Sequence, residues 1–389
     1  MIDYGREIAG FRMLDTVPRL KNRIMTRLQD RVLAAFANLE KKGSADSLFA
    51  KLARTLLGAH LYSIKLELNT ACTLNCKMCY IENGEESLPP DLLESLFNQL
   101  RGCGVRIELL GGEPLLREDI TRIIAGAKQL ANSPMVTLYT NGIHAEPELS
   151  RRLALAGLDA ALVTLVSHRP EVHDEFCGVK RTWNRTIEGI RNLKQAGITV
   201  YTFTAIHRDN CRDYQEIYRF VRDNLGAHPT FYQYIPQRKD DPLELCPEDW
   251  SEVKRWVINN TSESHMDFVR RFYMLTGSAC SGGNFVLTIK ADGSVQPCPF
   301  VSDIQLGNVY EQNIWSIYRN RYRNTRLGEF KRLPAECRSC TYRSVCAGGC
   351  RAACGTLYGA YDRKDQRCLG PYSELLNRSS VLNRVPTFF

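Results

Sequence analysis

The 389-residue sequence predicts an α/β protein: a partial (β/α)6 barrel of the TIM type, an N-terminal helical segment and a Cys-rich C-terminal domain. Three observations predict this fold. Six β-rich runs alternate with helical patterns between residues 62 and 260, the first 60 residues show helical periodicity, and cysteines crowd the last third of the chain. The chain exceeds the usual size of a single core. We therefore expect an N-terminal segment at 1–60, a barrel at 61–265, a Cys-rich domain at 266–375 and a tail at 376–389.

The N-terminal segment contains the basic, amphipathic stretch "VPRLKNRIMTRLQDRVLAAFANLEKK". Its apolar residues recur at helical spacing. The pattern predicts a helix that packs on the next domain with its charged face in water. A helix that binds a substrate leader or a membrane surface is the alternative.

The first strand of the barrel is expected to begin at residue 62. Strands are predicted at 62–69, 105–111, 135–141, 159–166, 199–206 and 229–235, and helices at 90–100, 117–130, 148–156, 182–197 and 212–225. Repeated β/α units give parallel strands joined by right-handed crossovers. The loops that follow the strands then meet at one face, where such folds bind their ligands.

The loop after the first predicted strand, "NTACTLNCKMCYI", holds three cysteines spaced C-x3-C-x2-C. Structural zinc sites normally use four protein ligands, and three thiolates leave one ligand missing. Cys72, Cys76 and Cys79 could hold three irons of a cubane iron–sulfur cluster, leaving the fourth iron open. Buried structural cysteines, or a zinc site completed by a distant residue, are the alternatives.

The C-terminal third is expected to be irregular and metal-bound. A hairpin is predicted in "NFVLTIKADGSVQPCPF" with Asp292-Gly293 at its turn, and a helix in "NIWSIYRNRYRN". The segment "CRSCTYRSVCAGGCRAAC" is too poor in apolar residues to build its own core. The fifteen cysteines are an odd number and occur in clusters, which favours metal ligation over disulfides.

Bulk composition describes an ordinary globular protein, 44% hydrophobic and 24% charged. The formal net charge of +8 counts every cysteine as neutral, and cluster-bound thiolates would reduce it, so no nucleic-acid partner is expected. No signal peptide and no membrane-spanning apolar run are visible. We expect a cytoplasmic protein.

The motifs resemble those of radical S-adenosylmethionine (radical SAM) enzymes that carry a SPASM domain. The resemblance implies that Cys72, Cys76 and Cys79 ligate a [4Fe–4S] cluster whose open iron binds S-adenosylmethionine (SAM). It also implies SAM contacts from "GGEP" after the second strand, from "TNG" after the third, and from a hydroxyl at the fourth: Gly111, Gly112, Glu113, Pro114, Asn141 and Thr164.

The C-terminal spacing C-x(9–15)-G-x4-C, C-x2-C-x5-C-x3-C and a last C resembles the SPASM pattern, with all seven positions filled. The resemblance implies two auxiliary clusters, expected to be [4Fe–4S]. The first would be held by Cys280, Cys298 and Cys350, and the second by Cys337, Cys340, Cys346 and Cys368. Cys354 is either a fourth ligand of the first cluster, or that iron stays open for substrate. Cys103, Cys177, Cys211 and Cys246 match no motif and are expected to be ordinary thiols.

The resemblance implies reductive cleavage of SAM and hydrogen-atom abstraction by a 5′-deoxyadenosyl radical. A peptide or protein side chain is the expected substrate. A tetrapyrrole side-chain decarboxylase of the heme-biosynthesis type is the second hypothesis, favoured by the tail "GGCRAACGTLYGAYDRKDQRC", and a non-catalytic iron–sulfur protein is the third. A flavodoxin or ferredoxin is the expected electron donor. The sequence assigns no catalytic acid or base.

Overall fold

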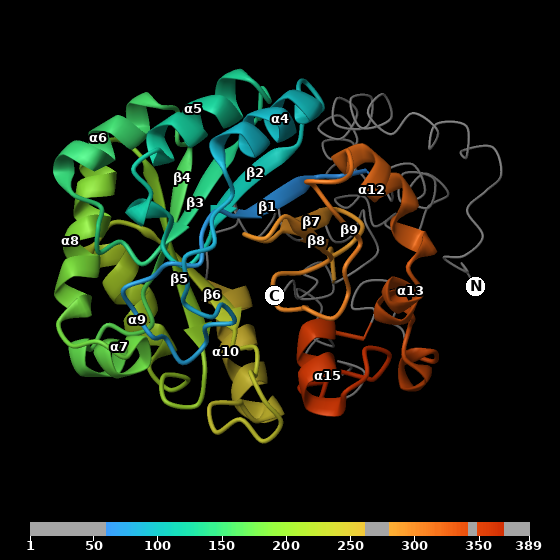
Figure 1. Ribbon diagram of the computed structural model, residues 1–389. Helices are drawn as coiled ribbons and strands as arrows, with labels where there is room; N and C mark the ends of the chain where they lie inside the picture. The colour runs from blue at the N-terminus through green and yellow to red at the C-terminus, as the bar shows by residue number, and fades with distance from the viewer. Residues whose placement is uncertain (1–59, 261–279, 341–347, 369–389) are drawn as a thin grey trace, which may run out of the picture.

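The computed structural model describes residues 60–260, 280–340 and 348–368, and its centre is one nine-stranded sheet (Figure 1). The strand order is β6-β5-β4-β3-β2-β1-β7-β8-β9. The strands are β1 Ser63–Glu67, β2 Arg106–Leu110, β3 Val136–Thr140, β4 Ala160–Thr164, β5 Thr199–Ile206, β6 His228–Gln233, β7 Val286–Ile289, β8 Ser294–Gln296 and β9 Gly307–Asn308. All pairs from β6 to β7 are parallel, which confirms the partial barrel. The predicted N-terminal segment and C-terminal tail lie outside the described residues.

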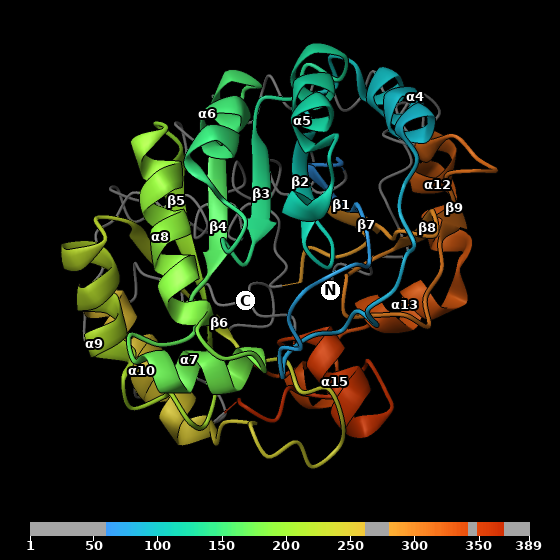
Figure 2. The ribbon, with the colours of Figure 1, turned by 60° about the vertical axis from the view of Figure 1, so that its left-hand side comes forward.

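Helices cover the outer side of the sheet, as Figures 1 and 2 show from two directions. These are α4 Pro90–Leu100, α5 Ile120–Gln129, α6 Pro147–Leu155, α8 Thr182–Gln195 and α9 Tyr214–Arg219, which continues as a π-helix at Phe220–Asn224. α7 Pro170–Cys177 lies instead at the carboxyl ends of the strands (Figure 2), and α10 Pro247–Asn260 follows β6. The C-terminal part adds α12 Ile314–Asn320, α13 Thr325–Lys331 and α15 Arg351–Tyr358.

Local sequence explains where these helices form. In α4, Pro90 begins the first turn, and Leu93, Leu96, Phe97 and Leu100 are buried at helical spacing. α7 was not predicted, although Pro170 opens it and Gly178 closes it in the left-handed region at φ 73°. With only eight residues, this helix is too short to show a clear helical period in the sequence.

Strand alternation separates two faces of the sheet. Ile64 and Leu66 of β1 and Ile107 and Leu109 of β2 lie in the main core with the helices. The intervening side chains lie on the opposite, concave face, where Lys65 and Glu108 are half-buried and Ser63 and Glu67 are buried. The concave face is therefore polar, while the helix-facing side is apolar.

The predicted hairpin forms, and one of its strands also pairs with the barrel sheet, which the sequence did not predict. β7 and β8 pair in antiparallel fashion around Gly293, whose φ is 80°. β7 also pairs in parallel with β1, from Ser63↔Val286 to Leu66↔Ile289. The C-terminal part thus continues the barrel sheet as a seventh parallel strand and places its cysteines next to the cysteine loop that follows β1.

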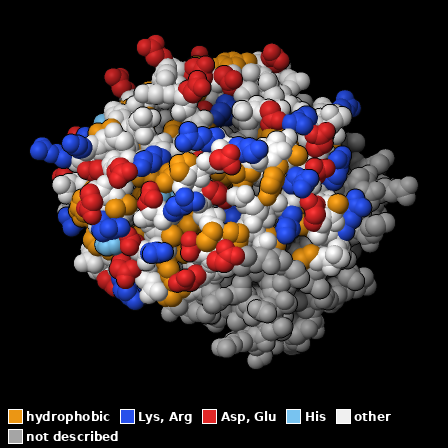
Figure 3. All heavy atoms as spheres, turned by 90° about the horizontal axis from the view of Figure 1, so that it is seen from below, with side chains coloured by type: hydrophobic (Ala, Val, Ile, Leu, Met, Phe, Trp, Pro, Cys, Tyr) orange, Lys and Arg blue, Asp and Glu red, His pale blue; other side chains and the backbone are white. Residues whose placement is uncertain are grey.

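The face of the molecule shown in Figure 3 carries no dominant charge. On the face seen in Figure 3, positive and negative side chains are interspersed. Within the described residues, no helix is both long and apolar enough to cross a membrane.

Candidate active site

The backbone of the cysteine loop after β1 is held on both sides by hydrogen bonds, to a side chain on one side and to the backbone of α7 on the other. The Cys72 amide donates to Asn83 Oδ1 (2.9 Å), and Asn83 Nδ2 donates back to the Cys72 carbonyl (3.1 Å). On the other side, the Asn75 amide donates to the Cys177 carbonyl (3.1 Å) and the Lys77 amide to the Phe176 carbonyl (2.9 Å). The end of α7 therefore positions the loop.

Gly178 makes this contact possible. A Cβ at this position would lie 2.6 Å from the Asn75 carbonyl oxygen, and the backbone is in the left-handed region. Only glycine meets both conditions without strain. The end of α7 can therefore approach the cysteine loop closely.

The three predicted cluster thiols lie near one another. Burial raises the pKa of Cys72 to about 11, and nearby Glu113, Cys76 and Cys79 add to the rise. The pKa of Cys76 is raised first by a hydrogen bond with the Cys177 thiol and then by burial. In the described part of the chain, no three side chains of the ligand types converge as a metal site. Cys72 and Cys76 are half-buried and Cys79 is exposed. The donor set nonetheless fits an iron–sulfur cluster, because thiolates held this close repel one another and are stabilised by positive metal ions.

The GGEP turn packs directly on the cysteine loop. The Gly112 amide donates to the Asn69 carbonyl (2.7 Å) and the Glu113 amide to the Ala71 carbonyl (2.8 Å). A Cβ on Gly111 or Gly112 would overlap Asn69 or the Ala71 carbonyl oxygen. The two glycines are therefore required by close backbone approach.

Glu113 connects this turn to the loop after β3. Its fully buried carboxylate accepts hydrogen bonds from the Leu115 amide (2.9 Å), Thr140 Oγ1 (2.7 Å) and the Asn141 amide (2.8 Å). Burial raises the pKa of Glu113, and these donors offset only part of the rise. The side chain of Glu113 thus has a structural role that the sequence did not reveal, and Pro114 begins the short 3-10 helix at Pro114–Leu116 that follows.

Asn141 has a free donor at the expected SAM site. Its Oδ1 accepts from the Ile143 amide (2.9 Å), while its buried Nδ2 has no hydrogen-bond partner among the described residues. Thr140 pairs with Val163 across β3 and β4, which brings Asn141 and Thr164 to neighbouring strand ends. An unpaired buried donor beside a half-buried hydroxyl fits a polar ligand such as SAM.

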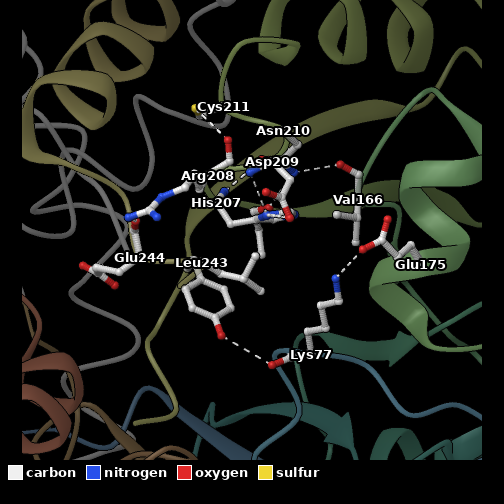
Figure 4. A network of polar contacts seen from close by, with 12 residues as sticks. Lys77, Val166, Glu175, His207, Arg208, Asp209, Asn210, Cys211, Leu243 and Glu244 are labelled. Atoms are coloured by element: carbon white, nitrogen blue, oxygen red, sulfur yellow. Dashed lines mark hydrogen bonds and ion pairs between the residues drawn. The ribbon is translucent and has the colours of Figure 1, made fainter. Parts of the chain in front are cut away.

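A second polar network, shown in Figure 4, ties the cysteine loop to β4, β5 and α7. Lys77 forms an ion pair with Glu175 of α7 (2.8 Å). Asn210 Nδ2 donates to the Val166 carbonyl (2.9 Å), and its Oδ1 accepts from the His207 amide (2.8 Å). The carboxyl ends of β4 and β5 are thus locked together behind the cysteine loop.

Charged and aromatic side chains line the concave face below this loop. Glu108 accepts from Ser63 Oγ (2.7 Å) and Tyr139 OH (3.0 Å) and pairs with Lys65 (3.1 Å). Burial opposes ionisation, but Lys65 and these donors hold the pKa of Glu108 below its usual value. Phe203 stacks on Tyr232 with ring centroids 4.2 Å apart.

The predicted ligands of the first auxiliary cluster also lie close together. Burial raises the pKa of Cys298 to about 12, with further rises from Cys280 and Cys350. Lys331 Nζ donates to the Cys280 carbonyl (2.9 Å), and burial lowers the pKa of this lysine to about 8. No pattern in the sequence points to Lys331, because it lies 51 residues from Cys280 in a helix without any motif.

The predicted second auxiliary set is described only in part. Cys337, Cys340 and Cys368 are in the described residues, and Cys346 is not. The Cys340 amide donates to the Cys337 carbonyl (3.2 Å). Cys354 is buried, and its Sγ donates to the Arg363 carbonyl (3.4 Å). Burial raises the pKa of this thiol, and nearby Asp365 and Cys350 add to the rise. Both predicted roles of Cys354 remain predictions.

Two aromatic residues connect the cysteine loop with the first auxiliary set. Tyr80, next to Cys79, packs on Phe300 with ring centroids 4.7 Å apart. Lys290 Nζ lies 4.7 Å from the centre of the Tyr80 ring and also pairs with Glu67. The only feature of the sequence that could have pointed to this contact is position, since Tyr80 and Phe300 each lie within two residues of a predicted ligand.

Comparison with known families agrees with this geometry. The radical SAM superfamily matches residues 66–221, and the SPASM iron–sulfur cluster-binding domain matches residues 280–341. The chain is a radical SAM enzyme with a C-terminal SPASM domain. A radical SAM enzyme requires a [4Fe–4S] cluster and SAM, and the SPASM domain binds auxiliary iron–sulfur clusters.

Curated relatives of this radical SAM enzyme include the AdoMet-dependent heme synthase of Methanosarcina barkeri (strain Fusaro / DSM 804). It is 27% identical over 79% of this chain and 95% of the relative. The AdoMet-dependent heme synthase of Oleidesulfovibrio alaskensis is 27% identical over 78% of this chain and 86% of the relative.

Solved structures share the fold. Native anSMEcpe with bound AdoMet has a TM-score of 0.66 at 16% identity, and the match covers 83% of this chain and 98% of that structure. Streptococcus suis SuiB bound to its precursor peptide SuiA has a TM-score of 0.65 at 18% identity, and the match covers 82% of this chain and 79% of that structure.

Proposed function

We propose that this radical SAM enzyme removes a hydrogen atom from a substrate bound against the concave face of the barrel. The supporting observation is that the GGEP turn lies between the two other strand-end loops. Its backbone contacts the cysteine loop, and the Glu113 carboxylate holds the TNG loop. These contacts support one site built from three loops at the carboxyl ends of β1, β2 and β3.

Cys72, Cys76 and Cys79 would hold the cluster that cleaves SAM. When bound, the cluster and SAM supply a 5′-deoxyadenosyl radical that takes a hydrogen atom from the substrate. Glu113 would keep the loops rigid, and the Asn141 amide group and Thr164 hydroxyl would orient SAM. The barrel wall would exclude water from the radical.

The substrate we propose is a tetrapyrrole propionate side chain. The relatives that match most of the chain carry the name AdoMet-dependent heme synthase, which supports the decarboxylase hypothesis. The concave face offers stacked rings at Phe203 and Tyr232 for a flat conjugated molecule, and Lys65 and Lys290 as nearby cations. The propionate would lose one hydrogen atom to the radical, then CO2 and one electron, leaving a vinyl group. A one-electron acceptor must take up that electron.

The peptide or protein side chain expected from the sequence is not confirmed by the curated relatives. The structures named for peptide complexes are below 20% identical and support the fold only. A peptide is therefore the competing substrate class. Membership of an enzyme family supports catalysis over the non-catalytic iron–sulfur alternative.

The test is an anaerobic reaction of the reconstituted full-length enzyme with SAM and dithionite. With a propionate-bearing tetrapyrrole, we expect 5′-deoxyadenosine together with a product that has lost the mass of CO2 and two hydrogens. Cleavage of SAM without any change in the tetrapyrrole would contradict the substrate proposal. Pools of ribosomal peptides are then the next substrates to test. Replacing dithionite with a flavodoxin or a ferredoxin tests the expected electron donor.

The ligand assignment has its own test. We expect roughly twelve irons per chain, and loss of about four irons and of all SAM cleavage when Cys72, Cys76 and Cys79 are changed to Ala. Cys103→Ala, at a buried thiol that donates to the Arg101 carbonyl, is the matched control and should keep its iron. Full iron content in the triple variant would refute the assignment.

A further inference from the structure

Cys177, expected to be an ordinary thiol, lies beside one of the proposed cluster ligands. The backbones of Asn75 and Lys77 donate to the carbonyls of Cys177 and Phe176. This pairing brings the side chain of Cys76, between the two donors, against the end of α7. The interaction with the Cys177 side chain is the largest cause that raises the pKa of the Cys76 thiol, and Cys177 is almost fully buried.

His173, one turn earlier in α7, fixes the direction of this interaction. The Val166 amide donates to His173 Nδ1 (3.3 Å), so Nδ1 must carry a lone pair. Burial lowers the pKa of His173 to about 4, and the imidazole is therefore neutral at pH 7. A neutral ring with an unprotonated Nδ1 carries its proton on Nε2.

The same reasoning extends to the thiol. His173 Nε2 lies 3.5 Å from Cys177 Sγ. Because Nε2 bears the proton, it donates and the sulfur of Cys177 accepts. The Cys177 S–H proton is then free to point to Cys76, the remaining partner of that thiol.

We propose that Cys177 is a positioning residue that donates an S–H hydrogen bond to the Cys76 sulfur and thereby raises the reduction potential of the SAM-cleaving cluster. The inference rests on the proposed ligand role of Cys76. A hydrogen bond to a ligand sulfur withdraws negative charge from the cluster, which favours the more negative, reduced state. The series of contacts Val166–His173–Cys177–Cys76 thus connects the backbone at the end of β4 with a ligand of the cluster.

The test measures the midpoint potential of this cluster by EPR-monitored titration of the reconstituted full-length enzyme without SAM. The relevant signal is the one absent from the Cys72, Cys76 and Cys79 triple variant. In Cys177→Ala we expect full iron content. At a fixed potential, the ratio of reduced to oxidised cluster should be about tenfold lower, which corresponds to a midpoint potential lower by about 59 mV. Cys177→Ser keeps a donor and should stay close to the wild type, and Cys103→Ala should match it.

Other outcomes separate the possibilities. An unshifted potential in Cys177→Ala with full iron overturns the proposal while the proposed function stands. Loss of about four irons in that variant also overturns it, because Cys177 would then be a ligand. If the Ala variant does not fold, Cys177→Val fills the space without a donor and should show the same shift. If the triple cysteine variant keeps its full iron content, the result contradicts the proposed function and therefore also this inference.

Discussion

At the scale of single residues, the site depends on buried polar groups whose partners come from other loops. Glu113 illustrates this, because its two carboxylate oxygens accept from Leu115, Thr140 and Asn141 and none of these lies in the cysteine loop. The motif predicted a SAM contact by the backbone of the turn. The structure adds a carboxylate that links the loops after β2 and β3.

Glu113→Gln should destabilise the enzyme without changing its size. One acceptor oxygen becomes an NH2 group that faces a backbone or hydroxyl donor, so a buried donor loses its partner. We expect a loss of about 1–3 kcal/mol in the free energy of unfolding, measured by denaturant titration under anaerobic conditions. Glu94→Gln, on the exposed side of α4, is the control and should lie within about 0.5 kcal/mol of the wild type.

Two buried histidines predict how stability depends on pH. Burial lowers the pKa of His173 and His207 to about 4 in the folded enzyme, against about 6.5 when unfolded. Between these values the unfolded chain binds more protons. The contribution is therefore complete above about pH 6.5 and is lost as the pH falls toward 4.

We expect each of these histidines to cost roughly 2 kcal/mol of stability between pH 7 and pH 5. Denaturant unfolding at both pH values measures it. His207→Phe preserves ring stacking on Phe176 and should reduce the pH dependence, whereas His228→Phe, at an exposed position, should leave it unchanged. An unaltered pH dependence in His207→Phe would show that the ring is protonated in the folded state.

At the scale of elements, the decisive feature is how closely loops and turns pack on one another. Residues 111 and 112 pass so near Asn69 and Ala71 that no side chain fits. Gly178 has the same function where α7 meets the cysteine loop. Both contacts hold the loop that carries the predicted cluster ligands, from opposite sides.

Gly112→Ala should displace the cysteine loop. Its new Cβ would overlap the Ala71 carbonyl oxygen, and backbone on both sides must move. We expect loss of about four irons per chain and of SAM cleavage, measured by iron analysis and 5′-deoxyadenosine formation.

Gly328→Ala is the matched control for this substitution. Gly328 lies in α13 with open space around its Cα, and alanine there should stabilise the enzyme by about 0.5–1 kcal/mol. Normal iron content in Gly112→Ala would show that the cysteine loop can move to accommodate the new Cβ and still bind its cluster.

At the scale of the whole molecule, the C-terminal part joins the barrel in two ways. β7 extends the sheet at β1, and a buried ion pair contacts the end of β6. Arg367 donates to Asp365 (2.9 Å) and to the Tyr234 carbonyl (3.0 Å), while Asp365 accepts from the Cys350 amide (2.9 Å). Burial opposes the charge on Asp365, but Arg367 holds the pKa of that carboxyl below its usual value.

Arg367→Met should break this connection and leave Asp365 buried without its cation. We expect a loss of about 3–5 kcal/mol in the free energy of unfolding, together with a weaker signal from the auxiliary clusters. Calorimetry and EPR measure the two effects. Arg332→Met, which removes an exposed pair with Asp362, should cost less than about 1 kcal/mol. Similar stability losses in both variants would contradict a connecting role for Arg367.

The sequence alone predicted strands β1 to β8, most of the barrel helices and α12, and it showed which cysteines and glycines are candidates for the site. Local periodicity, turn residues and motif spacing act over a few residues and can be read directly, as α4 and the turn at Gly293 show.

Only the tertiary structure decided three further features. These are the pairing of β7 with β1 across more than two hundred residues, the contacts of the Glu113 carboxylate, and the position of Cys177 against Cys76. Each depends on which segments, far apart in the sequence, come into contact when the curved sheet forms and packs against its helices. A periodicity within one segment carries no information about that choice, since the energy comes from packing between segments.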